Sequence, residues 1–229
     1  DSPTQFDFAF SNYLDDLCFI RHKGFQSAAN TYSGITYLAP ELKDHLPLSA
    51  RSLHSWSKLQ NATEGGPLPT EALGLVIREL AEAKKWWSVI VIVWSFDCYL
   101  RESDWESVAA EDISVTTNPE GVLQVACQLG SGSKGLSTKT GSNEGVIVDD
   151  PFVARILKFL KANSSARTTL IPIDQVQFRR EWWEALDKIE LTDLGPPHSM
   201  RHSRPSLQAL TKERTLEEIR RRGRWLSLK

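Results

Sequence analysis

The feature that most restricts the fold is a nearly continuous apolar run from Trp86 to Leu100. A membrane-spanning helix needs about 20 such residues, whereas this run is shorter and carries Asp97 near its end. It therefore belongs in the core of a globular domain. Its length indicates a buried helix, although the β-branched residues 89–93 would also fit a strand.

The flanking sequence predicts further helices and one small antiparallel sheet. Thr70 and Asp150 stand where helix caps are expected, and both can accept hydrogen bonds from the first turn. The predicted helices cover residues 3–23, 25–38, 47–58, 70–80, 86–100, 103–110, 151–160, 173–189, 199–210 and 216–222. The predicted strands cover residues 113–117, 122–127 and 145–148, and the turn at 118–121 joins the first two as a hairpin.

The segment 61–69 is rich in glycine and proline, which interrupt helices and strands. We expect a helical domain of residues 1–62, a linker of residues 63–69 and a second domain of residues 70–229. Hydrophobic residues make up 41% of the chain, which is ample for packed cores. The predicted fold class is mainly α with a small antiparallel β-sheet.

Cys18, Cys98 and Cys127 lie far apart and lack the spacing of metal ligands. We expect them to be buried free thiols in a reducing compartment. The N-terminal residues lack a signal-peptide pattern, and no run is long enough to span a membrane comfortably. We therefore expect a soluble, intracellular protein that has no membrane association and needs no metal or other cofactor.

The net charge of −2 does not by itself indicate a nucleic-acid partner. The charges are unevenly distributed, however. From Arg201 to Lys229 the chain carries nine lysines and arginines against three glutamates. The sequence therefore predicts basic terminal helices.

The clearest chemical signal is His198 with Arg201, a histidine and an arginine three residues apart. On a helix the two side chains project from the same side and can converge on one anion. Taken alone, such a pair is more often a capping or solvated feature. Other parts of the chain agree with it, because Arg101 follows the apolar run, Lys139 lies in a Lys-Thr-Gly turn, and Trp225 stands near the end.

In this order, Arg101, Lys139, His198-x-x-Arg201 and Trp225 resemble the active-site series of the tyrosine recombinases, the integrase family that includes phage integrases and Cre-like enzymes. The resemblance extends over nearly the whole chain. It implies a core-binding domain, a catalytic domain and metal-independent strand exchange in DNA, as in integration or in mobile elements. It also implies double-stranded DNA as the partner, further protomers in a dimeric or tetrameric synapse, and a nuclear or DNA-associated location.

The resemblance assigns Arg101 and Arg201 to the scissile phosphate. A guanidinium is always charged and its planar fork matches phosphate oxygens, which the point charge of a lysine cannot reproduce. His198 would hydrogen-bond the same phosphate and help to manage the proton of the nucleophile. His202 falls on a different helix face and is interpreted as structural.

Lys139 would protonate the leaving 5′ oxygen, with Lys134 in the same loop as its rival. Trp225 would donate its indole N–H to a phosphate oxygen, although packing of the core explains it nearly as well. Asp104, three residues after Arg101, would hold the phosphate-binding residues in position without contacting the DNA itself.

The series lacks its last member. The family's nucleophile is a tyrosine beyond the position of Trp225 that forms a covalent 3′-phosphotyrosyl intermediate, and all four tyrosines of this chain precede His198. The resemblance thus implies a catalytic domain truncated before the nucleophile, which binds DNA without cutting it in cis. Two alternatives stay open: a degenerate or domesticated descendant that binds DNA without chemistry, and an unrelated helical interaction protein.

Overall fold

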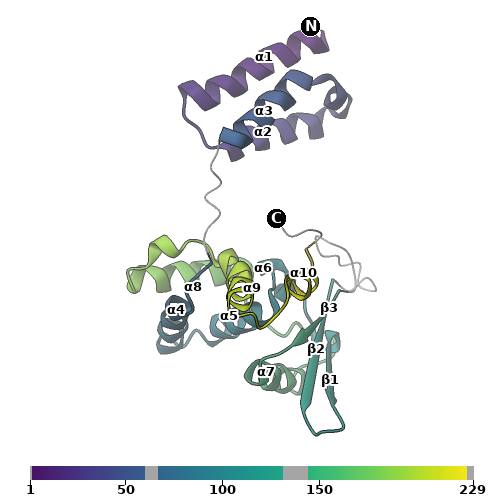
Figure 1. Ribbon diagram of the computed structural model, residues 1–229, viewed down its shortest axis with the longest axis vertical. Coiled ribbons are helices and arrows are strands. Elements are labelled where there is room, and N and C mark those ends of the chain that lie inside the picture. The colour runs from purple at the N-terminus through teal and green to yellow at the C-terminus, as the bar shows by residue number, and fades with distance from the viewer. Residues whose placement is uncertain (1, 60–66, 131–143, 226–229) are drawn as a thin grey trace. The chain divides into compact units, whose positions relative to one another are not determined.

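The computed structural model describes residues 2–59, 67–130 and 144–225. The chain divides into two compact units, Asp1–Glu64 and Gly65–Lys229, and each has its own hydrophobic core (Figure 1). Helices dominate both units, and the second contains a three-stranded antiparallel sheet. The predicted fold class is confirmed.

The first unit is helical. Its core contains aromatic and aliphatic side chains from all of its α-helices, including Phe10, Ala28 and Trp56. The α-helices are α1 (Pro3–Asp15), α2 (Phe25–Leu38) and α3 (Pro47–Leu59). A π-helical turn (Asp16–Ile20) continues α1, and a 3-10 turn (Pro40–His45) precedes α3.

A buried carboxylate on α1 holds the start of α3. Asp7 is 2% exposed and accepts hydrogen bonds from the Ser49 hydroxyl (2.7 Å), the Ser49 N–H (2.9 Å) and the Leu48 N–H (2.8 Å). The two N–H groups lie in the first turn of α3, where a helix offers them no acceptor. Burial opposes ionisation of Asp7, but these hydrogen bonds outweigh it and lower the pKa of the carboxyl.

The apolar run forms helix α5 (Trp86–Cys98), which is the centre of the second unit. Val91, Ile92 and Trp94 are fully buried. Helices pack around α5 on several sides, and the strand alternative for residues 89–93 is wrong. Helices that contact α5 include α4 (Thr70–Glu82), α6 (Glu102–Glu106), α7 (Pro151–Ala162), α8 (Gln175–Lys188) and α9 (Met200–Leu210).

The sheet lies against α7 at one side of the second unit (Figure 1). Its antiparallel strands follow the order of the sequence, with Cys127 paired to Ile113 on one side and to Val146 on the other. The strands are β1 (Ile113–Thr117), β2 (Leu123–Leu129) and β3 (Glu144–Val148). The remaining elements are α10 (Leu216–Gly223) and the 3-10 turns Ala110–Asp112, Thr192–Leu194 and Pro197–Ser199.

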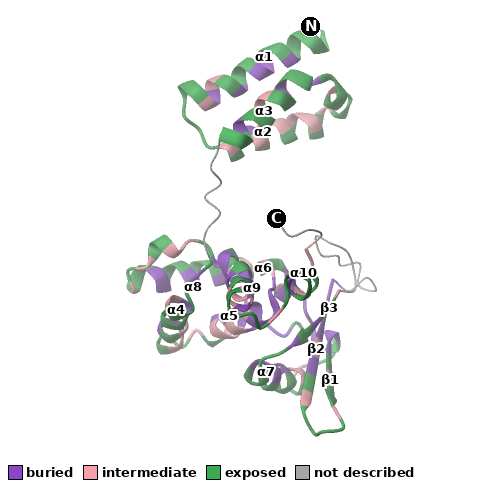
Figure 2. Ribbon diagram, in the orientation of Figure 1, coloured by how far each residue is buried: buried purple, intermediate pink, exposed green. Residues whose placement is uncertain are grey.

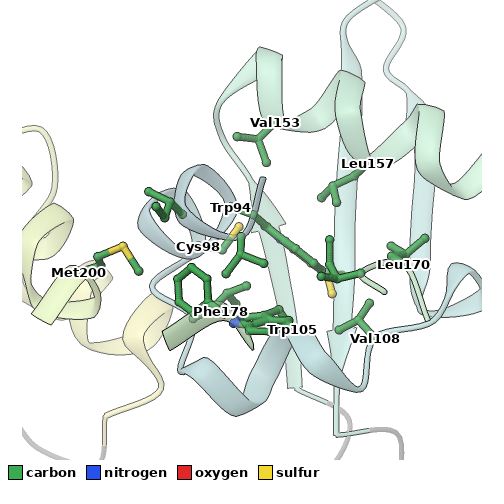
Figure 3. Packing of buried hydrophobic residues seen from close by; sticks show 14 of the residues in the cluster. Trp94, Cys98, Trp105, Val108, Val153, Leu157, Leu170, Phe178 and Met200 are labelled. Atoms are coloured by element: carbon green, nitrogen blue, oxygen red, sulfur yellow. The ribbon is translucent and has the colours of Figure 1, made fainter. Parts of the chain in front are cut away.

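Large aromatic side chains fill the core between α5, α6 and α8 (Figure 3). The rings of Trp105 and Phe178 meet edge to face with their centroids 5.8 Å apart, a favoured arrangement of aromatic pairs. Buried residues lie on the inner faces of the helices and on alternate positions of β2 (Figure 2). This core fixes the end of α5, from which the candidate site begins.

Two of the sequence-based expectations need correction. Thr70 is the first residue of α4 and does not cap it; Pro69 occupies the cap position, and no side chain bonds there. All three cysteines are free thiols, but only Cys98 and Cys127 are buried, because Cys18 lies partly exposed in the π-helical turn. The Asp150 cap is confirmed by hydrogen bonds from the N–H groups of Phe152 and Val153.

Within the described ranges, no helix is long and apolar enough to cross a membrane.

Asp7 provides a test of the first unit. Asp7→Ala should destabilise α3 by about 1–2 kcal/mol at neutral pH, because it leaves buried donors without an acceptor. Amide hydrogen exchange of α3 should speed up about 5- to 30-fold. Because the folded-state pKa of Asp7 is lowered, its contribution is present above the unfolded pKa of about 3.9 and is lost as pH falls through the folded value.

The matched control for this test is Asp44→Ala, since Asp44 is exposed on the neighbouring 3-10 turn. It should leave exchange of α3 unchanged. Equal effects of the two substitutions would show that Asp7 does not cap α3.

Candidate functional site

Three arginines from distant parts of the sequence converge on the carboxylate of Asp104. Arg101 Nη1 lies 3.8 Å from Oδ1, Arg201 Nη1 lies 3.8 Å from Oδ2, and Arg224 Nη2 lies 2.6 Å from Oδ2. The side chains of Asp104, Arg201 and Arg224 are 2%, 3% and 6% exposed, and that of Arg101 is 14% exposed. The charges interact strongly because little water screens them.

The end of α5 sets the positions of Arg101 and Asp104. Tyr99 adopts the left-handed conformation (φ 53°, ψ 40°) and ends the helix, so the chain turns before Arg101. The Arg101 N–H donates to Asp104 Oδ2 at 2.9 Å, which begins α6. Both charged residues are thus fixed relative to the buried core.

Arg201 joins three elements. From α9, its Nη1 donates to the Tyr99 carbonyl and its Nη2 to the Gly223 carbonyl at the end of α10. Burial, together with the nearby cations Arg101 and Arg224, lowers the pKa of Arg201 to about 9. The guanidinium therefore keeps its charge at neutral pH.

Arg224 was not among the predicted site residues, yet it makes the shortest contact with Asp104. It follows α10 in the left-handed conformation (φ 55°, ψ 41°), which turns the chain back toward the core. Its Nη2 also lies 3.4 Å from the Tyr99 carbonyl, and its Nε lies 3.5 Å from Glu144 Oε2. The only sequence signal for it was its place beside Trp225.

Trp225 packs against the cluster. Its ring stacks on those of Tyr99 (centroids 6.2 Å apart) and His202 (6.1 Å), and the Arg201 guanidinium carbon lies 5.5 Å from its centroid. The last contact is within cation–π range. The predicted site residues Arg101, Arg201 and Trp225 are therefore brought together.

His198 does not share a helix with Arg201, contrary to the expected helical pair. It lies in the 3-10 turn Pro197–Ser199, is exposed, and packs edge to face against His202 with centroids 5.4 Å apart. His202, interpreted from sequence as structural, thereby links His198 to Trp225. The 3-10 turn leads directly into α9 at Met200, so His198 lies just before the first residue of that helix.

The two candidate lysines, Lys134 and Lys139, lie outside the described residues. Their segment, residues 131–143, contains both lysines and no acidic residue. It therefore supplies no side-chain carboxylate to the site.

Many cations of the basic terminal helices are engaged in ion pairs. Arg220 and Arg221 pair with Glu217, and Arg222 Nη2 lies 2.9 Å from Asp149 Oδ2. Most arginines of the terminal helices therefore pair with acids of the same chain.

Arg222 belongs to a second cluster, in which charges balance. Arg222 and Arg214 face Asp149 and the buried Asp97, which lies 3.7 Å from Arg222. Burial raises the pKa of Asp97. One donor, Arg222 Nε, lacks an acceptor here. Two arginines against two carboxylates are what a structural ion cluster requires.

In the Asp104 cluster the positive and negative charges do not balance. Among the described residues, Arg101, Arg201 and Arg224 face two carboxylates, Asp104 and Glu144, so one positive charge is in excess. Arg101 Nη1 and both Nε and Nη1 of Arg224 are buried without a hydrogen-bond acceptor. Buried donors are nearly always paired in proteins. The arrangement is suited to binding an anion that has several oxygens.

The described parts of the chain contain no group of histidine, cysteine and acidic side chains arranged to hold a metal ion.

Comparisons with known proteins add a structural likeness. No family model matches the chain, and no curated protein matches its sequence. Among solved structures, the chain is similar to a mutant Flpe protein in complex with a DNA Holliday junction, with a TM-score of 0.49 and 16% sequence identity. The likeness covers 76% of this chain and 48% of that one, so the chain spans about half the length of the protein it resembles.

Asp104→Asn should strongly destabilise the second unit. Asparagine can still accept the Arg101 N–H, but it removes the charge that three buried guanidinium groups share, for which we expect a loss of about 3–5 kcal/mol. Urea unfolding followed by tryptophan fluorescence measures this, because seven of the eight tryptophans lie in the second unit.

Glu102→Gln on the same helix is the control for Asp104. Its partner Arg179 is 55% exposed, so the pair should contribute less than about 1 kcal/mol. Similar losses for the two substitutions would mean that Asp104 is not the centre of the cluster.

Gly223→Ala should disturb the packing of the Trp225 ring against α10. A Cβ at Gly223 would lie 2.5 Å from the Trp225 ring, which would have to move. We expect unfolding to become easier by about 1–3 kcal/mol. Gly74→Ala in α4, where a Cβ meets nothing within 4 Å, should instead stabilise the unit by about 0.5–1 kcal/mol. A gain at both positions would contradict the tight packing of Trp225.

Proposed function

We propose that this chain is a DNA-binding protein of the tyrosine recombinase type, and that Arg101 and Arg201 bind a phosphate of the DNA backbone. One observation carries the proposal. These two arginines stand 100 positions apart in the sequence, yet each lies 3.8 Å from the same buried carboxylate. The convergence supports the roles that the resemblance implies for them.

The chemistry of strand cleavage fits such a site. Attack on a phosphodiester builds negative charge on the non-bridging oxygens, and fixed cations in a water-poor site stabilise that charge without rearranging. Arg101 and Arg201 supply the cations, and Asp104 holds them in place. His198 would donate a hydrogen bond to the phosphate, and Trp225 would offer its indole N–H.

The remaining steps require groups beyond this cluster. Lys139 would protonate the leaving 5′ oxygen, and a tyrosine would form the 3′-phosphotyrosyl intermediate. Tyr99 is not that nucleophile: it is fully buried, its hydroxyl bonds to Gln208, and burial raises its pKa. The first unit would act as a core-binding domain, and further protomers would complete a synapse on DNA.

A second candidate is a DNA-binding protein without catalytic activity, descended from such a recombinase. The observation in its favour is that Tyr99, the tyrosine at the site, is fully buried and bonded to Gln208. The two candidates differ in whether a covalent protein–DNA adduct can form.

Two measurements separate these possibilities. Binding of a labelled duplex of mixed sequence should weaken steeply as salt rises, since phosphate contacts release counterions. The product of the complete reading frame, mixed with a pool of randomised nicked duplexes, should yield an SDS-resistant adduct. Binding without an adduct would favour the non-catalytic candidate. Absence of salt-dependent binding would overturn the proposal and favour a helical interaction protein.

Arg201→Lys in the product of the complete reading frame should reduce adduct formation about 10²- to 10³-fold, because lysine keeps the charge but loses the fork. DNA binding should stay largely intact. Arg180→Lys is the control, since Arg180 is 65% exposed on α8 and pairs only at the surface with Glu184. An unchanged rate of adduct formation in Arg201→Lys would remove Arg201 from the mechanism.

A further inference from the structure

Arg224 is more deeply buried than a cation of a DNA-facing surface would be. Its side chain is 6% exposed and its partners are Asp104, Glu144 and the Tyr99 carbonyl. Moving a guanidinium out of water is unfavourable unless an opposite charge lies nearby and its N–H groups find hydrogen-bond acceptors.

These partners satisfy only part of the guanidinium. The contacts within hydrogen-bond range are made by Nη2, which reaches Asp104 at 2.6 Å and Tyr99 at 3.4 Å. Nη1 is buried without an acceptor, and Nε, although it lies 3.5 Å from Glu144 Oε2, makes no hydrogen bond. An unsatisfied buried donor costs about 1–3 kcal/mol, and Arg224 leaves two such nitrogens, whereas Arg222 in the charge-balanced cluster leaves one.

Neutralisation of Asp104 does not explain Arg224 either. Arg101 and Arg201 already lie 3.8 Å from the two oxygens of that carboxylate. Glu144 offsets only one more of these charges, so the described residues of the cluster keep one positive charge in excess. Arg101 adds a second buried Nη1 without an acceptor. Two arginines with unused donors around one carboxylate indicate that an anion completes the cluster.

We propose that Arg224 is a third phosphate-binding residue, which contacts the DNA phosphate through Nη1 and Nε together with Arg101 and Arg201. This inference rests on the proposed function. A backbone phosphate provides two non-bridging oxygens that can accept from several guanidinium groups at once. Burial, together with the nearby cation Arg101, lowers the pKa of Arg224, and the carboxylates of Asp104 and Glu144 oppose this shift.

The test compares how DNA binding depends on salt in three variants of the full chain. Arg224→Gln removes one of the three cations from the shared phosphate and should reduce the slope of log K against log salt, by less than the value of about 0.9 that belongs to one whole phosphate. Arg201→Gln should do the same. Arg214→Gln is the matched control, because Arg214 lies in the same terminal region but pairs with Asp149 outside the cluster; its slope should equal that of the unsubstituted chain.

A slope for Arg224→Gln equal to that of the unsubstituted chain overturns the inference. If Arg201→Gln lowers the slope in the same experiment, the proposed function stands and only the role of Arg224 fails. If neither variant changes the slope, both proposals fail. These outcomes separate the two proposals.

Arg224→Lys covers the case in which Arg224→Gln does not fold. Lysine keeps the charge that Asp104 and Glu144 require but lacks the fork, so the salt slope should stay nearly constant while affinity falls about tenfold, which corresponds to about 1.4 kcal/mol. An affinity for DNA equal to that of the unsubstituted chain would show that Arg224 only balances the carboxylates.

Discussion

The buried carboxylate of Asp104 is the interaction on which the candidate site depends. Without it, three guanidinium groups would face one another with little water between them, and two like charges 4 Å apart repel by about 4 kcal/mol at an effective dielectric constant of 20. Asp104 offsets this repulsion while its own position is fixed by the Arg101 N–H at the start of α6. The arginines can therefore stay close together before any anion binds.

Elements whose pattern is local were predictable from the sequence. β1 was predicted at residues 113–117 and α2 at residues 25–38, as observed, because turn residues, glycine and proline mark their ends. The burial of α5 was predictable from composition alone. Arg101 and Arg201 could be proposed for one site because the order of residue types resembled a known series, although nothing local brings them together.

The rest of the site depends on contacts between residues far apart in the chain, which periodicity cannot reveal. Arg224 reaches Asp104 because a left-handed residue ends α10, and the sequence predicted the helix but not the direction of the turn. The sequence predicted basic terminal helices but not the partners of their cations, such as Asp97 and Asp149, which pair with Arg222. The exposed place of His198 follows from a 3-10 turn that the helical spacing did not indicate.

The two arginine clusters differ in a way that links stability to binding. Around Asp97 and Asp149 the charges of the described residues balance, and Arg222 joins α10 to α5 there. Around Asp104 the described residues have one positive charge in excess and leave three donor atoms without acceptors, which makes folding there less favourable. An anion that binds the folded state alone would offset this effect and stabilise the second unit. The arginines are thus preorganised in a way that lowers the free energy of unfolding of the second unit, and a bound anion should raise it again.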